Sequence, residues 1–260
     1  MGARAMWKAA LRIDELAVPV KLYAGVEERG VHFRLLEART RVPVQQRMID
    51  PRTGNEVAAA EIRRGIAVEP GVLVMLDDAE IEAAVPNPSR EIEVTRFVPP
   101  QAIDAAFYAR PYFLGPDGSG EAYGALAQAL ASSGLRGIAR WTMRGKRYFG
   151  ALVAQPSRLA LIALRSADSV VSADALTVPE SKVVSAAERK LAEQLIGALD
   201  GPFEPEALRD EHRARVLAWI DARARGRRLR LVDEAVPRPS TDLKRALERS
   251  IAHLEKRSAA

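Results

Sequence analysis

Short apolar runs dominate the first two-thirds of this 260-residue chain. They are rich in β-branched residues or alternate between apolar and polar positions, and glycine, proline or aspartate bounds each run, which is typical of strands. The predicted strands are residues 18–23, 31–36, 71–76, 91–98 and 158–165. Residues 50–56, DPRTGNE, suit the tight end of a hairpin. This many short strands predicts a barrel or a sandwich.

The clearest alternation lies in residues 137–152, GIARWTMRGKRYFGAL. Neighbouring side chains of a strand point to opposite faces. One face would carry Ile138, Arg140, Thr142 and Arg144, and the other Ala139, Trp141 and Met143. Residues 144–147 would form the turn, because Gly145 can take a positive φ. The pattern predicts a hairpin whose apolar face, with Trp141, enters the core and whose outer face carries arginine.

Two short helices are predicted within this strand-rich part. Acidic residues favour a helix start near Asp77 or Asp78. A second helix, at the stretch GPDGSGEAYGAL and beyond, aligns four residues on one face: Tyr123, Leu126, Ala127 and Leu130.

The last third is predicted to be helical. Residues 185–199 begin with a capping box, Ser185 to Glu188, and carry leucine at 191, 195 and 199. Residues 204–226 have Pro205 at a plausible first helical position and Gly226 as a stop. After a linker at 232–241, a helix at 241–258 aligns Leu243, Leu247, Ile251 and Leu254. A short amphipathic helix cannot bury such a stripe alone, so it either docks back on the chain or binds a partner.

Positive charge is clustered along the chain, whose net charge is +5 with 39 basic and 34 acidic residues. Eight arginines face four acids in residues 29–64, five basic residues and no acid lie in 136–147, and five arginines lie in 223–230. The planar guanidinium group suits phosphate oxygens. The clusters favour a polyanionic partner, whereas the net charge alone would not.

Composition narrows the class of protein further. The chain has no cysteine, which excludes disulfides and thiolate metal sites. No run of 18 apolar residues is present, and the N-terminus has no apolar signal core. We therefore expect a soluble, cytoplasmic protein without a membrane partner, associated with the nucleoid if its partner is DNA.

No catalytic, cofactor or metal site is predicted. The three histidines are far apart in the sequence, and GPDGSGEAYG matches neither common nucleotide-binding fingerprint. The acids Asp77, Asp78, Glu80 and Glu82 could hold a divalent metal, as in nucleases, but a capped and solvated helix start explains them better. Two other classes remain open: a metal-dependent nuclease and a monomeric module that binds nucleic acid generally.

Several segments together resemble bacterial Ku proteins of non-homologous end joining. The hairpin GIARWTMRGKRYFGAL and the stretch VPESKVV at 178–184 are among them. In order, the similar segments are residues 6–36, 38–83, 91–126, 137–152, 178–199 and 203–226. The resemblance implies an α+β fold, mainly β, with a β-barrel core, a strand-rich bridge excursion and a C-terminal helical arm. It places the core at 1–184 with the bridge at about 29–70, the arm at 185–231, and a linker and partner-recruiting helix at 232–260.

The resemblance also implies a function. Ku proteins bind ends of double-stranded DNA without sequence preference, as a ring-shaped homodimer, and recruit and stimulate a multidomain ATP-dependent repair ligase. They are not enzymes and use no cofactor.

The resemblance assigns roles to residues in three regions. The expected phosphate contacts are Lys8, Arg12, Arg34, Arg39, Arg41, Arg47, Arg52, Arg63, Arg64, Arg140, Arg144, Lys146 and Arg147. The expected dimer-clasping residues of the arm are Leu208, Val216, Trp219 and Ile220. The expected ligase-recruiting residues are Leu243, Leu247 and Ile251. Contacts to phosphate rather than to bases suit a protein that must bind any DNA end.

Overall fold

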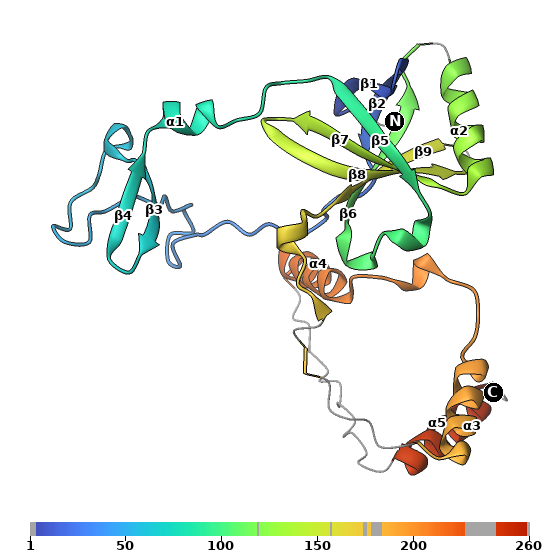
Figure 1. The fold of residues 1–260 in the computed structure, drawn as a ribbon. Coiled ribbons are helices and arrows are strands. Elements are labelled where there is room, and N and C mark those ends of the chain that lie inside the picture. The colour runs from blue at the N-terminus through green and yellow to red at the C-terminus, as the bar shows by residue number, and fades with distance from the viewer. Residues whose placement is uncertain are drawn as a thin grey trace. The chain divides into compact units, whose positions relative to one another are not determined.

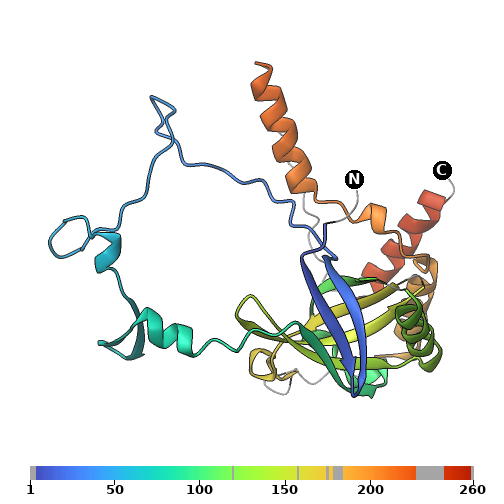
Figure 2. The same ribbon diagram turned by 90° about the horizontal axis from the view of Figure 1, so that it is seen from above.

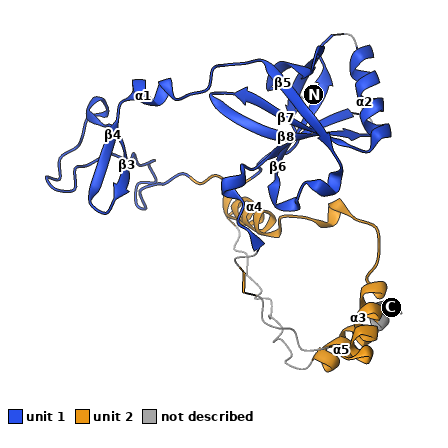
Figure 3. Cartoon of the chain, in the orientation of Figure 1, with its two compact units in different colours: residues 1–29, 34–173 blue, residues 30–33, 174–260 orange. Residues whose placement is uncertain are grey.

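The structure, a computed structural model, describes residues 4–118, 120–156, 158–173, 176–177, 184–226 and 243–258. The chain forms two compact units, 1–29 with 34–173, and 30–33 with 174–260 (Figure 3). Among the described residues, strands β1 to β9 and helices α1 and α2 belong to the first unit, and helices α3, α4 and α5 to the second.

Seven strands close into a barrel in the first unit (Figure 1). Around the barrel they are β1 (Trp7–Ile13), β2 (Leu16–Ala24), β6 (Tyr108–Pro116), β9 (Arg158–Leu164), β8 (Lys146–Gln155), β7 (Arg136–Met143) and β5 (Glu91–Val98). Neighbouring strands are antiparallel, except that β5 returns to pair with β1 in parallel and so closes the barrel. This confirms the predicted α+β, mainly β fold with a barrel core.

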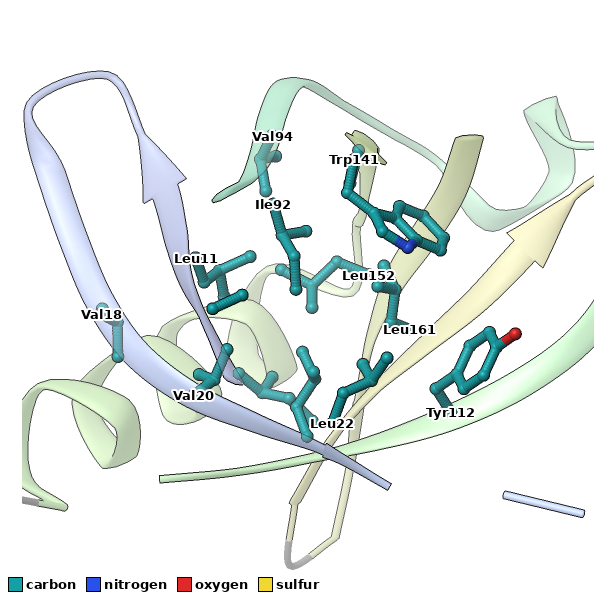
Figure 4. Close-up of a cluster of buried hydrophobic side chains, with 14 of the residues drawn as sticks. Leu11, Val18, Val20, Leu22, Ile92, Val94, Tyr112, Trp141, Leu152 and Leu161 are labelled. Atoms are coloured by element: carbon teal, nitrogen blue, oxygen red, sulfur yellow. The ribbon is translucent and has the colours of Figure 1, made fainter. Parts of the chain in front are cut away.

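The barrel interior is filled by alternate residues of each strand (Figure 4). Leu11, Val20, Leu22 and Ile92 are fully or almost fully buried there, as period-2 alternation requires. Helix α2 (Glu121–Ser133) packs against β8 and β2 with Tyr123 and Leu130 buried, two of the four residues predicted to share its inner face.

The indole of Trp141 shapes the core at the β7–β8 pair. It is buried, stacks on Tyr148 at a centroid distance of 5.3 Å, and meets Tyr112 edge-on. Gly150 leaves room for it, because a Cβ atom there would lie 2.7 Å from the indole ring. The prediction that Trp141 faces the core is confirmed.

Most of the predicted strands are present, and one is wrong. Residues 18–23, 71–76, 91–98 and 158–165 lie almost entirely in β2, β4 (Val72–Leu76), β5 and β9. Residues 31–36 form no strand: only Leu36 is bridged, to Pro43, and the run finds no neighbouring strand to pair with. The pattern also did not single out β1, β3 (Arg64–Glu69) or β6. The pairing of β6 with β9 is irregular between Tyr108 and Pro111.

Residues 25–90, hereafter the excursion, leave the barrel after β2 and return at β5 (Figure 2). They contain a 3-10 turn (Ala59–Glu61), a two-stranded antiparallel sheet of β3 (Arg64–Glu69) and β4 (Val72–Leu76), and helix α1 (Asp78–Ala83). Every residue of β3 and β4 is exposed. A two-stranded sheet with exposed apolar side chains is marginal by itself, which makes the excursion a candidate for contact with a partner.

The second unit contains α3 (Ala186–Ala198), a 3-10 turn (Pro205–Ala207), α4 (Glu211–Ala224) and α5 (Leu243–Ser258). The predicted capping box of α3 is present: Ser185 Oγ accepts from the backbone N–H of Glu188, whose carboxylate accepts from the N–H of Ser185. The predicted single helix at 204–226 is wrong at its start. Asp210 caps α4 by accepting from the N–H of Arg213, so Pro205 begins a separate turn and Leu208 lies outside the helix.

Gly226 ends α4 as predicted, with a φ of 70°. The predicted linker at 232–241, the stretch VPESKVV except its last residue, and Arg227 to Arg230 lie outside the described residues.

Candidate nucleic-acid interface

The β7–β8 hairpin positions the basic residues that the sequence singles out. Trp141 pairs with Tyr148 and Met143 with Lys146, which leaves a two-residue turn of Arg144 and Gly145. Both turn residues have positive φ values, 50° and 72°, the geometry of a two-residue hairpin turn matched to strand twist. Arg144 was expected both on the strand face of Arg140 and in a turn at residues 144–147. It lies in the turn, so the strand alternation does not set its direction. The predicted turn is too long, because Lys146 and Arg147 belong to β8.

Arg140 is paired within the barrel. Its Nε and Nη2 atoms donate to the two carboxylate oxygens of Glu93 at 2.7 and 2.9 Å, and the two residues are directly opposite one another on β7 and β5. The hydrogen bonds from Arg140 lower the pKa of Glu93. The sequence shows no acid between Arg136 and Arg147, but the fold supplies one from a strand 47 residues away.

The basic residues of the first strand are paired as well. Arg12 lies 3.2 Å from Glu91, and Lys8 lies 3.1 Å from Asp117, which also binds Lys21 at 2.8 Å. Hydrogen bonds from Lys21 and Lys8 lower the pKa of Asp117. Arg12 stands beside Glu93 in the β1–β5 register, so Arg12, Glu93 and Arg140 form a row of alternating charge across three strands. This row offers a DNA phosphate less positive charge than the sequence implies.

The basic residues at the tip of the hairpin differ from Arg140, Arg12 and Lys8 in their pairing. Within the described residues, Arg144, Lys146 and Arg147 form no ion pair. Arg147 lines a cleft of about 270 Å³ with Ser89 and Thr142. Arg144 lines a neighbouring cleft of about 330 Å³, which Ser89 and Thr142 also line and to which Arg90 contributes.

Arg90 is a candidate that the sequence analysis missed. It precedes β5 directly, at the point where the excursion rejoins the barrel, and its carbonyl accepts a hydrogen bond from the N–H of Ala10. The signal available was a single arginine at the start of a strong strand pattern, beyond the predicted end of the bridge at about residue 70. The structure brings Arg90 to the cleft that Arg144 of the hairpin tip lines.

In residues 29–64 of the excursion, several arginines lie in or next to tight turns. The carboxylate of Glu37 accepts from the backbone N–H groups of Arg39 and Thr40, and Arg41 has a positive φ of 60°. A hydrogen bond from the Thr40 side chain, followed by those from the two backbone N–H groups, lowers the pKa of Glu37. The predicted turn at 50–56 is also present, with Ile49 bridged to Glu56 and Gly54 at a φ of 74°.

The predicted contact residues of the excursion divide into two groups. Three have acidic neighbours: Arg47 lies 2.8 Å from Glu56, Arg64 3.8 Å from Asp78, and Arg52 4.0 Å from Asp50. The others form no ion pair with a described residue: Arg34, Arg39, Arg41 and Arg63. Arg63 donates to the carbonyl oxygens of Ala60 and Ile62, so its direction is partly fixed. All of these side chains are exposed.

Basic and acidic residues are unevenly distributed along the excursion. Residues 29–64 contain eight arginines and four acids, whereas residues 65–89 contain five acids and no lysine or arginine. A polyanion is attracted to the first half and repelled by the second. Contacts to phosphate are therefore expected from residues 29–64 and from the hairpin tip.

Three of the four acids at residues 77–82 have structural uses. Asp77 and Glu80 form a capping box for α1, and Asp78 neighbours Arg64. In the part of the chain that the structure describes, no three His, Cys, Asp or Glu side chains lie together in a way that could hold a metal ion. No helix of the described ranges is long and apolar enough to cross a membrane.

The expected arm residues lie on or near α4. Trp219 and Ile220 are 48% and 47% exposed, Val216 is half-buried, and Leu208 is exposed ahead of the helix. The expected ligase-recruiting residues lie on α5, where Leu247 and Ile251 are half-buried and Leu243 is exposed.

Comparison with known proteins gives one consistent result. The family model described as the Ku70/Ku80 beta-barrel domain matches residues 12–193. The chain is 37% identical to "Non-homologous end joining protein Ku 2" of Geotalea uraniireducens, over 96% of this chain and 98% of the relative. It is 33% identical to "Non-homologous end joining protein Ku" of Heliobacterium modesticaldum, over 98% and 94% of the two chains. The protein of that name from Coxiella burnetii is 30% identical, over 98% and 97%.

Proposed function

The chain belongs to the Ku family, and from that membership we propose that it binds the ends of double-stranded DNA in non-homologous end joining. The observation that carries the proposal on this chain's own residues is the basic hairpin tip beside Arg90. Arg147 lines one cleft, and Arg144 and Arg90 line the adjoining one. These three residues and Lys146 form no ion pair with a described acid.

Binding is proposed to be independent of sequence. The candidate contacts are long basic side chains at a turn and in an exposed excursion, and such side chains reach phosphates without reading base edges. Trp141, one of the aromatic residues of the hairpin, is buried in the barrel and is not accessible to a base. Affinity should therefore depend strongly on salt, because each neutralised phosphate releases counterions.

The active form is proposed to be a homodimer that encircles the duplex. Trp219 and Ile220 support this part, because large apolar side chains that are about half exposed on one helix favour a protein partner. The apolar side chains of β3 and β4, all exposed, offer further surface. A closed ring would hold DNA by topology in addition to its ion pairs.

The protein is proposed to act without catalysis and to recruit and stimulate a multidomain ATP-dependent repair ligase through α5. The amphipathic pattern of that helix supports a role in recognition. Three acids of α1 argue against a nuclease, because Asp77 and Glu80 form the capping box of the helix and Asp78 lies beside Arg64.

End-dependent binding can be tested with a duplex that carries biotin at both ends. Streptavidin added before the protein should prevent binding, because it closes both entry points. Streptavidin added after the protein should trap the complex and slow its dissociation. Equal binding and equal dissociation in both orders would contradict the proposal.

A further inference from the structure

The apolar stripe of α5 lies against another helix of the same chain. Helices α3 and α5 pack together within the second unit. The residues of α3 with reduced exposure are Glu188, Leu191, Ala192 and Leu195, which share one helix face. On α5 the apolar residues with reduced exposure include Leu247, Ile251 and Leu254, which also share a face. Of the two outcomes left open by the sequence, α5 therefore docks back on the chain.

Electrostatics place the two helix starts near one another. The Ser185 hydroxyl and backbone N–H groups are the main causes of the lowered pKa of Glu188, and the positive charge of Lys244 lowers it further. Lys244 belongs to the first turn of α5 and Glu188 to the first turn of α3. This attraction is consistent with the packing of the two apolar faces.

We propose that α3 is an intramolecular latch for α5. It covers Leu247 and Ile251, two of the three residues through which α5 is proposed to recruit the ligase, so full recruitment requires α5 to leave α3. This inference rests on the proposed recruiting role for the identity of the competitor. The contact between the helices does not depend on that role.

The contact is suited to reversible release. The facing residues are half-buried rather than buried, and each helix is short enough to be marginal in water without a partner. A partner that offers a deeper apolar groove would bury more of the same stripe and displace α3. The stripe would then remain covered when no partner is present, which protects an apolar surface from nonspecific association.

The latch is tested by changing α3 and leaving α5 intact. In the full-length chain, Leu191→Asp with Leu195→Asp should raise amide hydrogen exchange in residues 243–254 at least tenfold. It should also tighten binding of the purified repair ligase several-fold, because α5 no longer has to be released. Leu191→Ala with Leu195→Ala should give smaller changes in the same direction.

The matched control is Ile196→Asp, on the same helix at a position that is 71% exposed. It should change neither exchange in α5 nor ligase binding. If exchange in α5 stays at the wild-type rate in the Leu191/Leu195 variants, the latch is wrong. If exchange rises but ligase binding stays the same or weakens, α3 does not compete with the ligase, and the latch is again wrong.

A further variant separates this inference from the proposed function. Deletion of residues 243–260 should abolish ligase binding if α5 is the recruiting helix. Unchanged ligase binding in the deletion variant would overturn the recruiting role and with it the competition. The exchange measurement would still report whether α3 and α5 are docked.

Discussion

Arg140 and Glu93 form an ion pair with two hydrogen bonds, of 2.7 and 2.9 Å, across neighbouring strands of the barrel. The pair divides the basic residues of this protein into two classes. Residues such as Arg140, Arg12 and Lys8 have acidic partners in the barrel, whereas the hairpin tip and Arg90 have none among the described residues. Only the second class can give its full charge to DNA.

The substitution Glu93→Gln should release Arg140 from its partner. If Arg140 faces DNA, affinity for duplex DNA should rise, and the slope of log K against log salt should steepen by about 0.9, the value for one additional phosphate contact. Titration over a salt series measures this slope. The double variant Glu93→Gln/Arg140→Gln is the control and should restore the wild-type slope. An unchanged slope in Glu93→Gln would mean that Arg140 lies away from DNA.

Removing charge from the hairpin tip should have the opposite effect. Lys146→Ala with Arg147→Ala should weaken binding to all duplex sequences about equally and flatten the salt slope by roughly 2, about 0.9 for each lost contact. The control Arg189→Ala with Lys190→Ala removes the same charge from exposed positions of α3. Equal losses in the two double variants would show that net charge, rather than the hairpin tip, determines affinity.

The packing of Trp141 over Gly150 predicts that replacement by alanine lowers the stability of the protein at Gly150 but not at Gly124. Gly150→Ala should lower the free energy of unfolding by about 1–3 kcal/mol, because the added methyl group would overlap the indole ring and the carbonyl oxygen of Ile162. Gly124→Ala, in helix α2 with open space around it, should be neutral or stabilise by up to about 1 kcal/mol. Denaturant unfolding of the two variants checks this. A neutral Gly150→Ala would contradict the assigned packing.

The exposed residues of α4 predict the oligomeric state. Trp219→Asp with Ile220→Asp should convert a dimer to a monomer and weaken DNA binding, because an aspartate pair cannot be desolvated in an apolar interface. Light scattering of the full-length variant measures its mass, and Val171→Asp, at an exposed position outside the expected arm, provides the control that should remain dimeric. A dimer that persists in the Trp219/Ile220 variant would place the main interface elsewhere.

The local features that the sequence predicts well are those that neighbouring residues determine. Alternation gave the β7–β8 hairpin and the inward direction of Trp141, and the Ser185–Glu188 spacing gave the start of α3. Tertiary pairing decided the rest. The run at 31–36 has strand-like residues but no strand to pair with. Strand β6 was not predicted, because Pro111 interrupts its pattern.

In the candidate site, too, the sequence predicts local features but not those that depend on tertiary pairing. The sequence identifies where basic residues are concentrated, but it does not show which of them the fold neutralises. Glu93 reaches Arg140, and Asp117 reaches Lys8 109 residues away, only because the barrel brings their strands together. For the same reason Arg90 gains its place beside the hairpin tip from the return of the excursion at β5.

The most direct test of the central claim compares two forms of one DNA molecule. The protein is titrated with a linear duplex and with the covalently closed circle of the same sequence, at the same salt concentration and with no divalent metal. If the protein binds DNA ends, it should bind the linear form with much higher affinity, and cutting the circle once should restore that affinity. Equal affinity for the two forms would contradict end binding and would indicate a general binder of double-stranded DNA.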